Sequence, residues 1–366
     1  MESLGNASFT LDSDDPSVNG TASMVSYAGR DLSMILRVSY SLIGAVGMLG
    51  NGLVLFVIYR VPSLRNITNL FIFNQSLIDF VSSVFLCVCF LTPVIPLPSD
   101  ATLAAIFCAI WSSRYIYWGA HKASTTNLLV LTLERYVAIV HPIYYRRHIR
   151  RRRAVMVAIL VWVVGYAFQL FWAAVQRVVG GVCLIDWPNK EAKMAFGLLL
   201  FFTQIVIPVS IMIFIYVSIY MVLNGRISTV SVEEDEPSRQ QGQDGGSQPS
   251  RPAPAGLRNV LPNYRAAARN NVLKTLLIIC IVYVVCWAPN MTIFVYYSVG
   301  GKVDFSGWQY LSAVCLAFGN MVLNPFIYTF KYDKFKKALG KVFRGNSRKG
   351  MSDESNVSDK PWSTNT

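Results

Sequence analysis

Several polar side chains lie inside long apolar runs, where each needs a partner. Asp79 follows Leu77 and Ile78 in one such run. An ionised carboxylate in apolar surroundings is costly, so it requires hydrogen-bond donors, a cation or a proton. The candidate partners, each at a similar depth in its own run, are Asn51, Ser124, Asn320 and Asn324. Two arrangements remain open: a sodium ion held by oxygens of Asp79, Ser124 and Asn320, or a water-filled cluster around a protonated Asp79.

A charged pair ends another apolar run, in the sequence Glu134-Arg135-Tyr136. Adjacent opposite charges neutralise each other while the helix end stays near water. Any membrane helix can end in a pair whose long side chains reach the interface. This tripeptide is therefore a weak signal by itself.

Prolines interrupt three of the later runs, at Pro208, Pro289 and Pro325. A proline removes one helical hydrogen bond and permits a bend. A single proline in such a run is more often a packing feature than a switch. Three of them in three late runs predict a bundle that moves at its cytosolic end. Their polar and aromatic neighbours are Tyr216, Trp287, Asn324 and Tyr328.

Seven apolar stretches must position these side chains: 36–59, 70–94, 106–140, 154–175, 194–223, 272–299 and 308–330. About 20 residues, rising about 1.5 Å each, cross the roughly 30 Å of a bilayer core. The 366-residue chain is 53% hydrophobic and only 14% charged, whereas soluble domains have about 25% charged residues. Backbone groups in lipid must pair within each segment. We therefore predict an all-α membrane protein, a seven-helix bundle in which the third stretch is the least apolar.

The net charge of +13 is unevenly distributed. Lys and Arg cluster after the third and the seventh stretches, whereas residues 1–31 are acidic. Positive residues mark the cytosolic side, so we predict a plasma-membrane protein with an extracellular N-terminus and a cytosolic C-terminus. Because the basic clusters flank the stretches, they predict contact with membrane lipid and no binding of nucleic acid. Segment 1–34 is expected to be an extracellular tail glycosylated at the sequons of Asn6 and Asn19.

Two cysteines differ from the rest in their location. Cys108 lies at the outer end of the third stretch, and Cys183 lies in the second outer gap. Both face an oxidising compartment, so we expect a disulfide between them. Such a bond would tie the second outer loop to the third helix.

Three further segments complete the predicted organisation around a seven-helix domain at 35–331. Residues 224–268 have the composition of a disordered cytosolic loop. Residues 332–344 place apolar side chains at helical spacing between lysines, which predicts an amphipathic helix on the inner membrane surface. Residues 345–366 are expected to form a disordered, Ser/Thr-rich cytosolic tail.

Taken together, these features resemble the rhodopsin-like (class A) G-protein-coupled receptors, over about residues 35–345. Each motif is weak singly, but their order through the stretches is specific. The motifs are Gly50-Asn51, Asn74 with Asp79, Cys108 with Trp111, Glu134-Arg135-Tyr136, Trp162, Cys183, Pro208 with Tyr216, Cys286-Trp287-Ala288-Pro289 and Asn324-Pro325-Phe326-Ile327-Tyr328. The resemblance implies a receptor, not an enzyme. It would bind an extracellular ligand and catalyse nucleotide exchange on a heterotrimeric G protein as its sixth helix moves outward.

The resemblance also implies roles for the polar residues. Arg135, between Glu134 and Tyr136, would engage the G protein, and Trp287 would sense the agonist. The inner switch would consist of Tyr216, Pro289, Asn324, Pro325 and Tyr328. An allosteric sodium ion would be held by Asp79, Ser124, Asn320 and Asn324, and no other cofactor or metal is expected. The tail would be phosphorylated by a receptor kinase and would bind arrestin.

The sequence departs from the family pattern in three ways. Arg269 stands at the inner start of the sixth stretch, where the family often has an acid that locks the arginine, so this lock is not expected. Thr125 and Tyr283 replace the aliphatic residue and the Phe of a relay that includes Pro208. The interval from Cys108 to Arg135 is two residues longer than usual, which predicts a bulge in the outer part of the third helix.

The nature of the ligand follows partly by exclusion. The third stretch has Tyr115 or Tyr117, according to register, where amine receptors have an acid, and Phe318 replaces the retinal lysine of opsins. The expected pocket is aromatic and polar: Tyr117, Trp118, His121, Gln204, Asn290, Phe294 and Tyr310. Lys122 and His121 are placed where they could meet a carboxylate or an amide, although a hydrogen-bonded interior histidine is the slightly favoured interpretation of His121. The motif at residues 134–142 is similar to neuropeptide receptors, so a peptide is the leading hypothesis, with a non-amine small molecule or a lipid as the alternative.

Two other classes of protein fit the sequence less well. A channel or transporter would show inverted repeats or broken half-helices, and neither is found in the sequence. A membrane enzyme would need a metal site or a nucleophile. The histidines His121, His141 and His148 do not form a ligand set, and no G-x-S-x-G motif is present.

Overall fold

The computed structural model describes the backbone of residues 19–92, 95–234, 255–304, 307–331 and 333–343, with side chains placed for 34–92, 95–222, 277–304, 307–331 and 334–343. Its elements, in chain order, are α1 (Asn19–Arg60), η2 (Pro62–Leu64), α2 (Ile67–Leu91), α3 (Ala101–Ile106), η3 (Phe107–Ser112), α4 (Tyr115–Val140), α5 (Pro142–His148), α6 (Arg151–Ala174), β1 (Gln176–Val179), β2 (Val182–Ile185), α7 (Lys190–Phe201), η4 (Phe202–Val206), α8 (Ile207–Glu234), α9 (Ala255–Ser298), α10 (Trp308–Lys331) and α11 (Asp333–Phe343).

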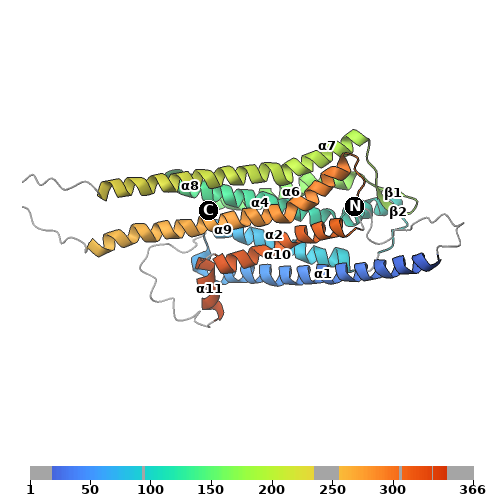
Figure 1. The fold of residues 1–366 in the computed structure, drawn as a ribbon, viewed down its shortest axis with the longest axis horizontal. Helices are drawn as coiled ribbons and strands as arrows, with labels where there is room; N and C mark the ends of the chain where they lie inside the picture. The colour runs from blue at the N-terminus through green and yellow to red at the C-terminus, as the bar shows by residue number, and fades with distance from the viewer. Residues whose placement is uncertain (1–18, 93–94, 235–254, 305–306, 332, 344–366) are drawn as a thin grey trace, which may run out of the picture.

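The long helices lie side by side along the longest axis of the molecule (Figure 1). α4 packs against α2, α6 and α8, which places it inside the bundle. α1 packs against α2 and α10, and α9 packs against α10 and α7. The predicted all-α bundle of seven spans is confirmed, with α7, η4 and α8 together forming the fifth span.

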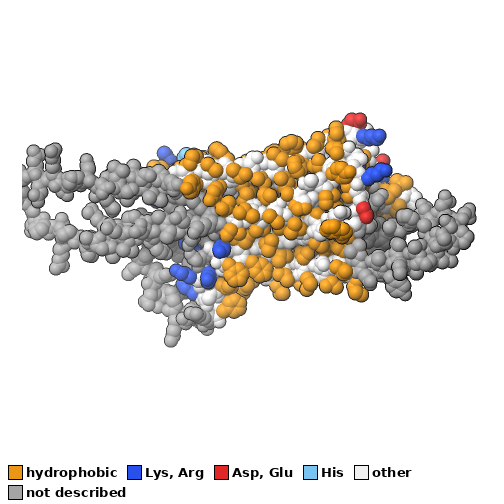
Figure 2. Space-filling model, viewed as in Figure 1, with side chains coloured by type: hydrophobic (Ala, Val, Ile, Leu, Met, Phe, Trp, Pro, Cys, Tyr) orange, Lys and Arg blue, Asp and Glu red, His pale blue; other side chains and the backbone are white. Residues whose placement is uncertain are grey.

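The lateral surface of the bundle is apolar (Figure 2). Leu49, Phe214 and Phe330 are 76%, 64% and 67% exposed, respectively. Contiguous apolar surface of this kind is a liability in water and is expected where lipid surrounds the helices. By length and composition, six described helical segments can cross a membrane, and α4 is not among them. This agrees with the prediction that the third stretch is the least apolar.

The third span is interrupted near its outer end, where the longer interval from Cys108 to Arg135 predicted a bulge. η3 is a π-helix, and α4 begins only after Arg114, whose φ of 55° is left-handed. A left-handed conformation is strained for any residue with a Cβ. The guanidinium of Arg114 lies over the ring of Phe90, 4.5 Å from its centre. The extra residues are therefore absorbed by a π-turn and a kink, and α4 continues regularly to its inner end.

The fifth span has a similar irregularity, the π-helix η4, immediately before Pro208 in α8. A π-turn inside an α-helix leaves local carbonyls without their usual helical donors. Pro208 adds to this effect because it has no N–H to offer the residue one turn earlier. The carbonyls of Thr203 and Gln204 accept side-chain donors instead.

Three helices extend beyond the predicted spans. α1 begins at Asn19 inside the expected tail 1–34, and α8 and α9 enter the loop 224–268 that we expected to be disordered. Once a helix is nucleated, each added residue gains a hydrogen bond, so helices continue past the bilayer boundary. The remainder of that loop, 235–254, lies outside the described residues.

The predicted amphipathic helix is α11. Phe335 and Ala338 are buried in the same apolar cluster as Ile327 and Tyr328 of α10. Phe343 is 72% exposed, and α11 turns across the end of the bundle (Figure 1). Its apolar face therefore anchors the chain against the inner end of α10.

Candidate functional site

A cavity opens among α4, α6, α7, η4 and α9, towards the end of the bundle that carries the β-hairpin. It is lined by Trp118, His121, Lys122, Gln169, Trp172, Leu200, Gln204, Trp287, Asn290, Met291 and Phe294. Three of these residues, Trp118, His121 and Lys122, are spaced i, i+3 and i+4, so they share one face of α4. The structure thus brings together five of the predicted pocket residues: Trp118, His121, Gln204, Asn290 and Phe294.

The other two predicted pocket residues, Tyr117 and Tyr310, do not line this cavity. Both are buried in a separate apolar cluster that also contains Tyr40 and Phe318, and the rings of Tyr117 and Phe318 are 5.2 Å apart. Successive residues of a helix point about 100° apart, so Tyr117 faces α10 while Trp118 faces the cavity. The hydroxyl of Tyr115 donates to the carbonyl of Tyr166 on α6 at 2.8 Å. Of the two tyrosines considered for the position of the amine receptors' acid, Tyr117 is the one buried inside the bundle. This is the register obtained by counting outward from Arg135.

Sequence reasoning missed several residues of the cavity wall. Gln169 and Trp172 of α6 belong to it, as do Leu200 and Met291. Gln169 is a buried amide within an otherwise apolar stretch. A lone polar residue in such a stretch was the feature of the sequence that could have indicated a cavity residue. Trp287, predicted as the agonist sensor, lines the same cavity with its ring 5.3 Å from that of His121.

A β-hairpin is held at the outer end by the predicted disulfide. Cys108 of η3 and Cys183 of β2 are bonded, with their Cα atoms 5.4 Å apart. The turn uses Gly180 and Gly181, with φ of 58° and 78°, as a two-residue hairpin turn requires. Trp172, a wall residue, packs in one apolar cluster with Val175 and Phe196. The disulfide and this cluster fix the outer loop beside the cavity.

A hydrogen-bonded cluster beneath the cavity takes the place of the family's apolar relay. The Gln204 amide donates to Thr125 Oγ1 at 2.6 Å, and Tyr283 Oη lies 3.2 Å from the same oxygen. The single proton of the Tyr283 hydroxyl can be donated to the carbonyl of Gln204, one of those left free before Pro208, while the hydroxyl stays beside Thr125 Oγ1. This relay, Gln204–Thr125–Tyr283, joins α4, η4 and α9 through buried polar groups.

Asp79 is fully surrounded by hydrogen-bond donors. Its carboxylate accepts from Ser124 Oγ at 3.0 Å, from Asn324 Nδ2 at 2.8 Å and from Gln75 Nε2 at 3.2 Å to each oxygen. Within the described part of the chain, Asn320 is buried but does not bond to Asp79, and Asn51 bonds to the carbonyls of Gly47 and Met321.

Gln75 is the residue that sequence reasoning overlooked at this site. Its Nε2 lies 2.5 Å from Ser124 Oγ, between the two oxygens expected to hold sodium. Its Oε1 accepts from Asn127 Nδ2 at 2.9 Å, which fixes the orientation of the amide. In this arrangement the donor groups of Gln75, Ser124 and Asn324 point at the carboxylate. Sodium binding stays a prediction, and it requires Gln75 to withdraw.

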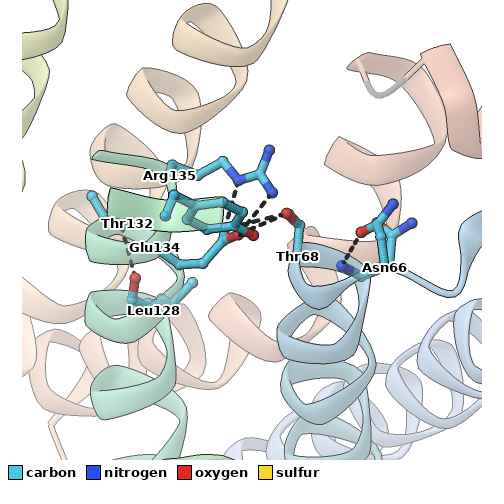
Figure 3. Close-up of polar contacts among 8 residues, drawn as sticks. Asn66, Thr68, Leu128, Thr132, Glu134 and Arg135 are labelled. Carbon is cyan, nitrogen blue, oxygen red and sulfur yellow. Dashed lines mark hydrogen bonds and ion pairs between the residues drawn. The ribbon is translucent and has the colours of Figure 1, made fainter. Parts of the chain in front are cut away.

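The inner end of α4 carries the charged pair (Figure 3). Arg135 Nε lies 2.7 Å from Glu134 Oε2, and Glu134 also accepts from Thr68 Oγ1 at 3.1 Å and from the Tyr145 hydroxyl at 2.5 Å. Burial, and then the hydrogen bond to Glu134, raise the pKa of Tyr145 above its usual range. Tyr145 therefore remains a donor, and three elements converge on one carboxylate.

The other predicted switch residues are distributed along the bundle and, in the described part of the chain, do not form one hydrogen-bonded group. Tyr216 packs with Tyr136 in an apolar cluster that contains Ile215 and Ile219. The Tyr328 hydroxyl is buried without a hydrogen-bond partner among the described side chains. Pro325 lies inside α10, and Pro289 lies in α9 beside Trp287. The inner switch is thus in an arrangement where Arg135 is paired with Glu134 and Tyr216 is not paired with Tyr328.

Several predicted sites lie outside the described side chains. They are the sequons of Asn6 and Asn19, the side chain of Arg269 and the Ser/Thr-rich tail at 345–366.

Comparison with known proteins identifies the class. Residues 50–328 match the family model of the 7 transmembrane receptor (rhodopsin family). The chain is 27% identical to galanin receptor type 1 of Rattus norvegicus, over 91% of this chain and 90% of that protein. It is 25% identical to the human KiSS-1 receptor, over 81% of this chain and 71% of that protein. It is 24% identical to somatostatin receptor type 2 of Mus musculus, over 88% and 81% respectively.

Because the family model covers more than half of the chain, this protein belongs to the rhodopsin family of seven-transmembrane receptors. It is accordingly a multi-pass membrane receptor that couples to G proteins, and the predicted resemblance is confirmed.

Proposed function

We propose that this receptor is activated by an extracellular peptide at the outer cavity. The observation that carries the proposal is the cavity itself, which is aromatic, contains no acidic side chain among its lining residues and lies beside a disulfide-anchored hairpin. The named relatives include receptors for galanin and somatostatin, which supports a peptide over a non-amine small molecule or a lipid.

Signalling would pass from the cavity to the inner end through α9. Trp287 lines the cavity, and Tyr283, one turn further in, belongs to the relay with Thr125 and Gln204. A ligand that shifts these residues would allow the inner part of α9 to move outward. Arg135 would then leave Glu134 and engage the G protein.

The orientation and the remaining partners complete the proposal. Lys and Arg gather at the end that carries α11 (Figure 2), which supports a cytosolic location for that end. The N-terminus would then be extracellular at the plasma membrane. The basic face of α11 would contact anionic lipid, and the tail would be a substrate of a receptor kinase and a site for arrestin.

The test is G-protein activation in cells that express the full chain with promiscuous G proteins. A peptide panel, beginning with galanin and somatostatin, should contain an agonist. Arg135→Ala should nearly abolish agonist-driven nucleotide exchange at equal surface expression, since Arg135 would provide the G-protein contact. Arg146→Ala, which removes an exposed arginine of α5, is the matched control. A lipid or a small acid that activates where all peptides fail would reject the peptide assignment.

A further inference from the structure

Lys122 places a buried amino group in the wall of the outer cavity. It is only 7% exposed. Its Nζ donates to the carbonyl of Thr203 at 2.9 Å and to Gln204 Oε1 at 3.3 Å, and it lies 4.5 Å from the centre of the Phe168 ring. All these partners are neutral. Among the residues whose side chains are described, no carboxylate forms a salt bridge with Lys122.

Two other groups in the same cavity lack partners. Trp287 Nε1 and His121 Nε2 are buried and have no hydrogen-bond partner among the described side chains. Trp287 can only donate, and His121 Nε2 donates when it carries the ring proton. Buried polar atoms are almost always paired in native structures. The cavity therefore presents the Lys122 amino group, the unpaired donor Trp287 Nε1 and an unpaired imidazole nitrogen, with no acid among its lining residues.

We propose that the ligand carries a carboxylate that enters this cavity and pairs with Lys122. A carboxylate that enters the cavity would favour the ammonium form of Lys122 and pair with it, and its oxygens would also accept from Trp287. In a peptide this group is either the free C-terminus or the side chain of an Asp or Glu. The inference rests on the proposed function in one respect, that the agonist occupies this cavity.

The same contact links binding to the relay. Lys122 bonds to Gln204 Oε1, while the amide of Gln204 bonds to Thr125 beside Tyr283 of α9. A carboxylate would compete with Gln204 for the ammonium of Lys122. Gln204 would then be free to reorient, and the hold of η4 on α9 would weaken.

The first experiment measures binding without signalling. The purified full-length receptor is melted with 3-phenylpropionate or with 3-phenylpropionamide, which have the same ring and differ in charge. The acid should bind about tenfold more tightly than the amide, as expected for hydrogen bonds to a charged group. Lys122→Met should abolish this preference and Lys122→Arg should retain it. Lys302→Met, which removes an exposed cation at the same end of the bundle, should leave the preference unchanged.

The second experiment uses an agonist peptide from the panel. Each peptide is compared with its C-terminal amide and with variants in which one Asp or Glu becomes Asn or Gln. One of these changes should lower potency about thirtyfold or more, the usual effect of removing one partner of a buried charge pair. The position that responds distinguishes the C-terminus from a side chain.

The outcomes separate the two proposals. Equal stabilisation by the acid and the amide, or no stabilisation by either, would overturn the carboxylate inference, and this comparison on the unmodified receptor does not depend on any variant folding. An agonist peptide that tolerates loss of every carboxylate would also overturn it while leaving the peptide receptor intact. Selective binding of the acid, together with the failure of every peptide to activate G protein, would instead reject the proposed function alone.

Discussion

Glu134 is the residue on which the inner end of the receptor depends, because one carboxylate serves Arg135, Thr68 and Tyr145. Tyr145→Phe removes a hydrogen bond to a charged acceptor, which is worth about 1.5–3 kcal/mol. Glu134 is then held less firmly, and so is Arg135. We expect basal nucleotide exchange to rise about tenfold at equal expression, measured in membranes without agonist. Tyr144→Phe is the matched control, since Tyr144 is exposed and stacks on His148.

We predict that Gln75 competes with an ion for the Asp79 site. Its amide nitrogen lies against both Asp79 oxygens and Ser124 Oγ. Gln75→Leu removes this internal donor and leaves oxygens that suit a small cation. We expect agonist affinity to become more sensitive to sodium than to potassium in the variant, as measured by radioligand competition in the two salts. Equal sodium sensitivity with and without Gln75 would show that the amide does not compete with an ion.

At the scale of elements, α4 and α6 approach so closely that Gly165 is the one described glycine whose added Cβ would lie within 3.0 Å of backbone atoms. A Cβ on Gly165 would lie 2.6 Å from the backbone nitrogen of Ala123 and 2.7 Å from the carbonyl oxygen of Gly119. Backbone atoms cannot move aside as a flexible side chain can, so Gly165→Val should cost about 3 kcal/mol. We expect a large loss of surface expression and of melting temperature. Gly319→Ala, where nothing lies within 4 Å, should leave both unchanged or slightly raised.

The elements also show what a sequence reveals and what it hides. Apolar stretches of membrane length predicted the helices, and the motif order predicted the family, because both depend on local composition. The long interval from Cys108 to Arg135 predicted an irregular third helix, but not its form, a π-turn and a left-handed Arg114. Arg114 lies over Phe90 and Tyr115 packs on Tyr166, and spacing does not predict these contacts between helices. The exclusion of Tyr117 from the cavity and the role of Gln75 depend on side-chain direction, which spacing alone does not determine.

At the scale of the whole molecule, two groups of hydrogen bonds lie at different depths in the bundle, and we expect both to oppose the transition to the active state. The relay of Gln204, Thr125 and Tyr283 holds α9 near the cavity, and the Glu134 cluster holds Arg135 at the inner end. If activation is a transition of the entire bundle between two states, each restraint biases the same equilibrium from a different place.

This arrangement predicts how variants combine. Tyr283→Phe frees the carbonyl of Gln204 and loosens α9, so basal exchange should rise several-fold. Adding Thr125→Val should have little further effect, since both substitutions break the same hydrogen-bonded relay. The effects of substitutions within one network are not additive. Adding Tyr145→Phe should instead multiply the effect of Tyr283→Phe, because distant restraints contribute independent free energies. The measurement is basal nucleotide exchange of the single and double variants, far enough below the agonist maximum that the response is not saturated.

Multiplicative effects of the Tyr283 and Thr125 substitutions would show that the relay does not act as a unit. A Tyr145 variant that added nothing to Tyr283→Phe would show that the two ends share a single local restraint and not one global transition.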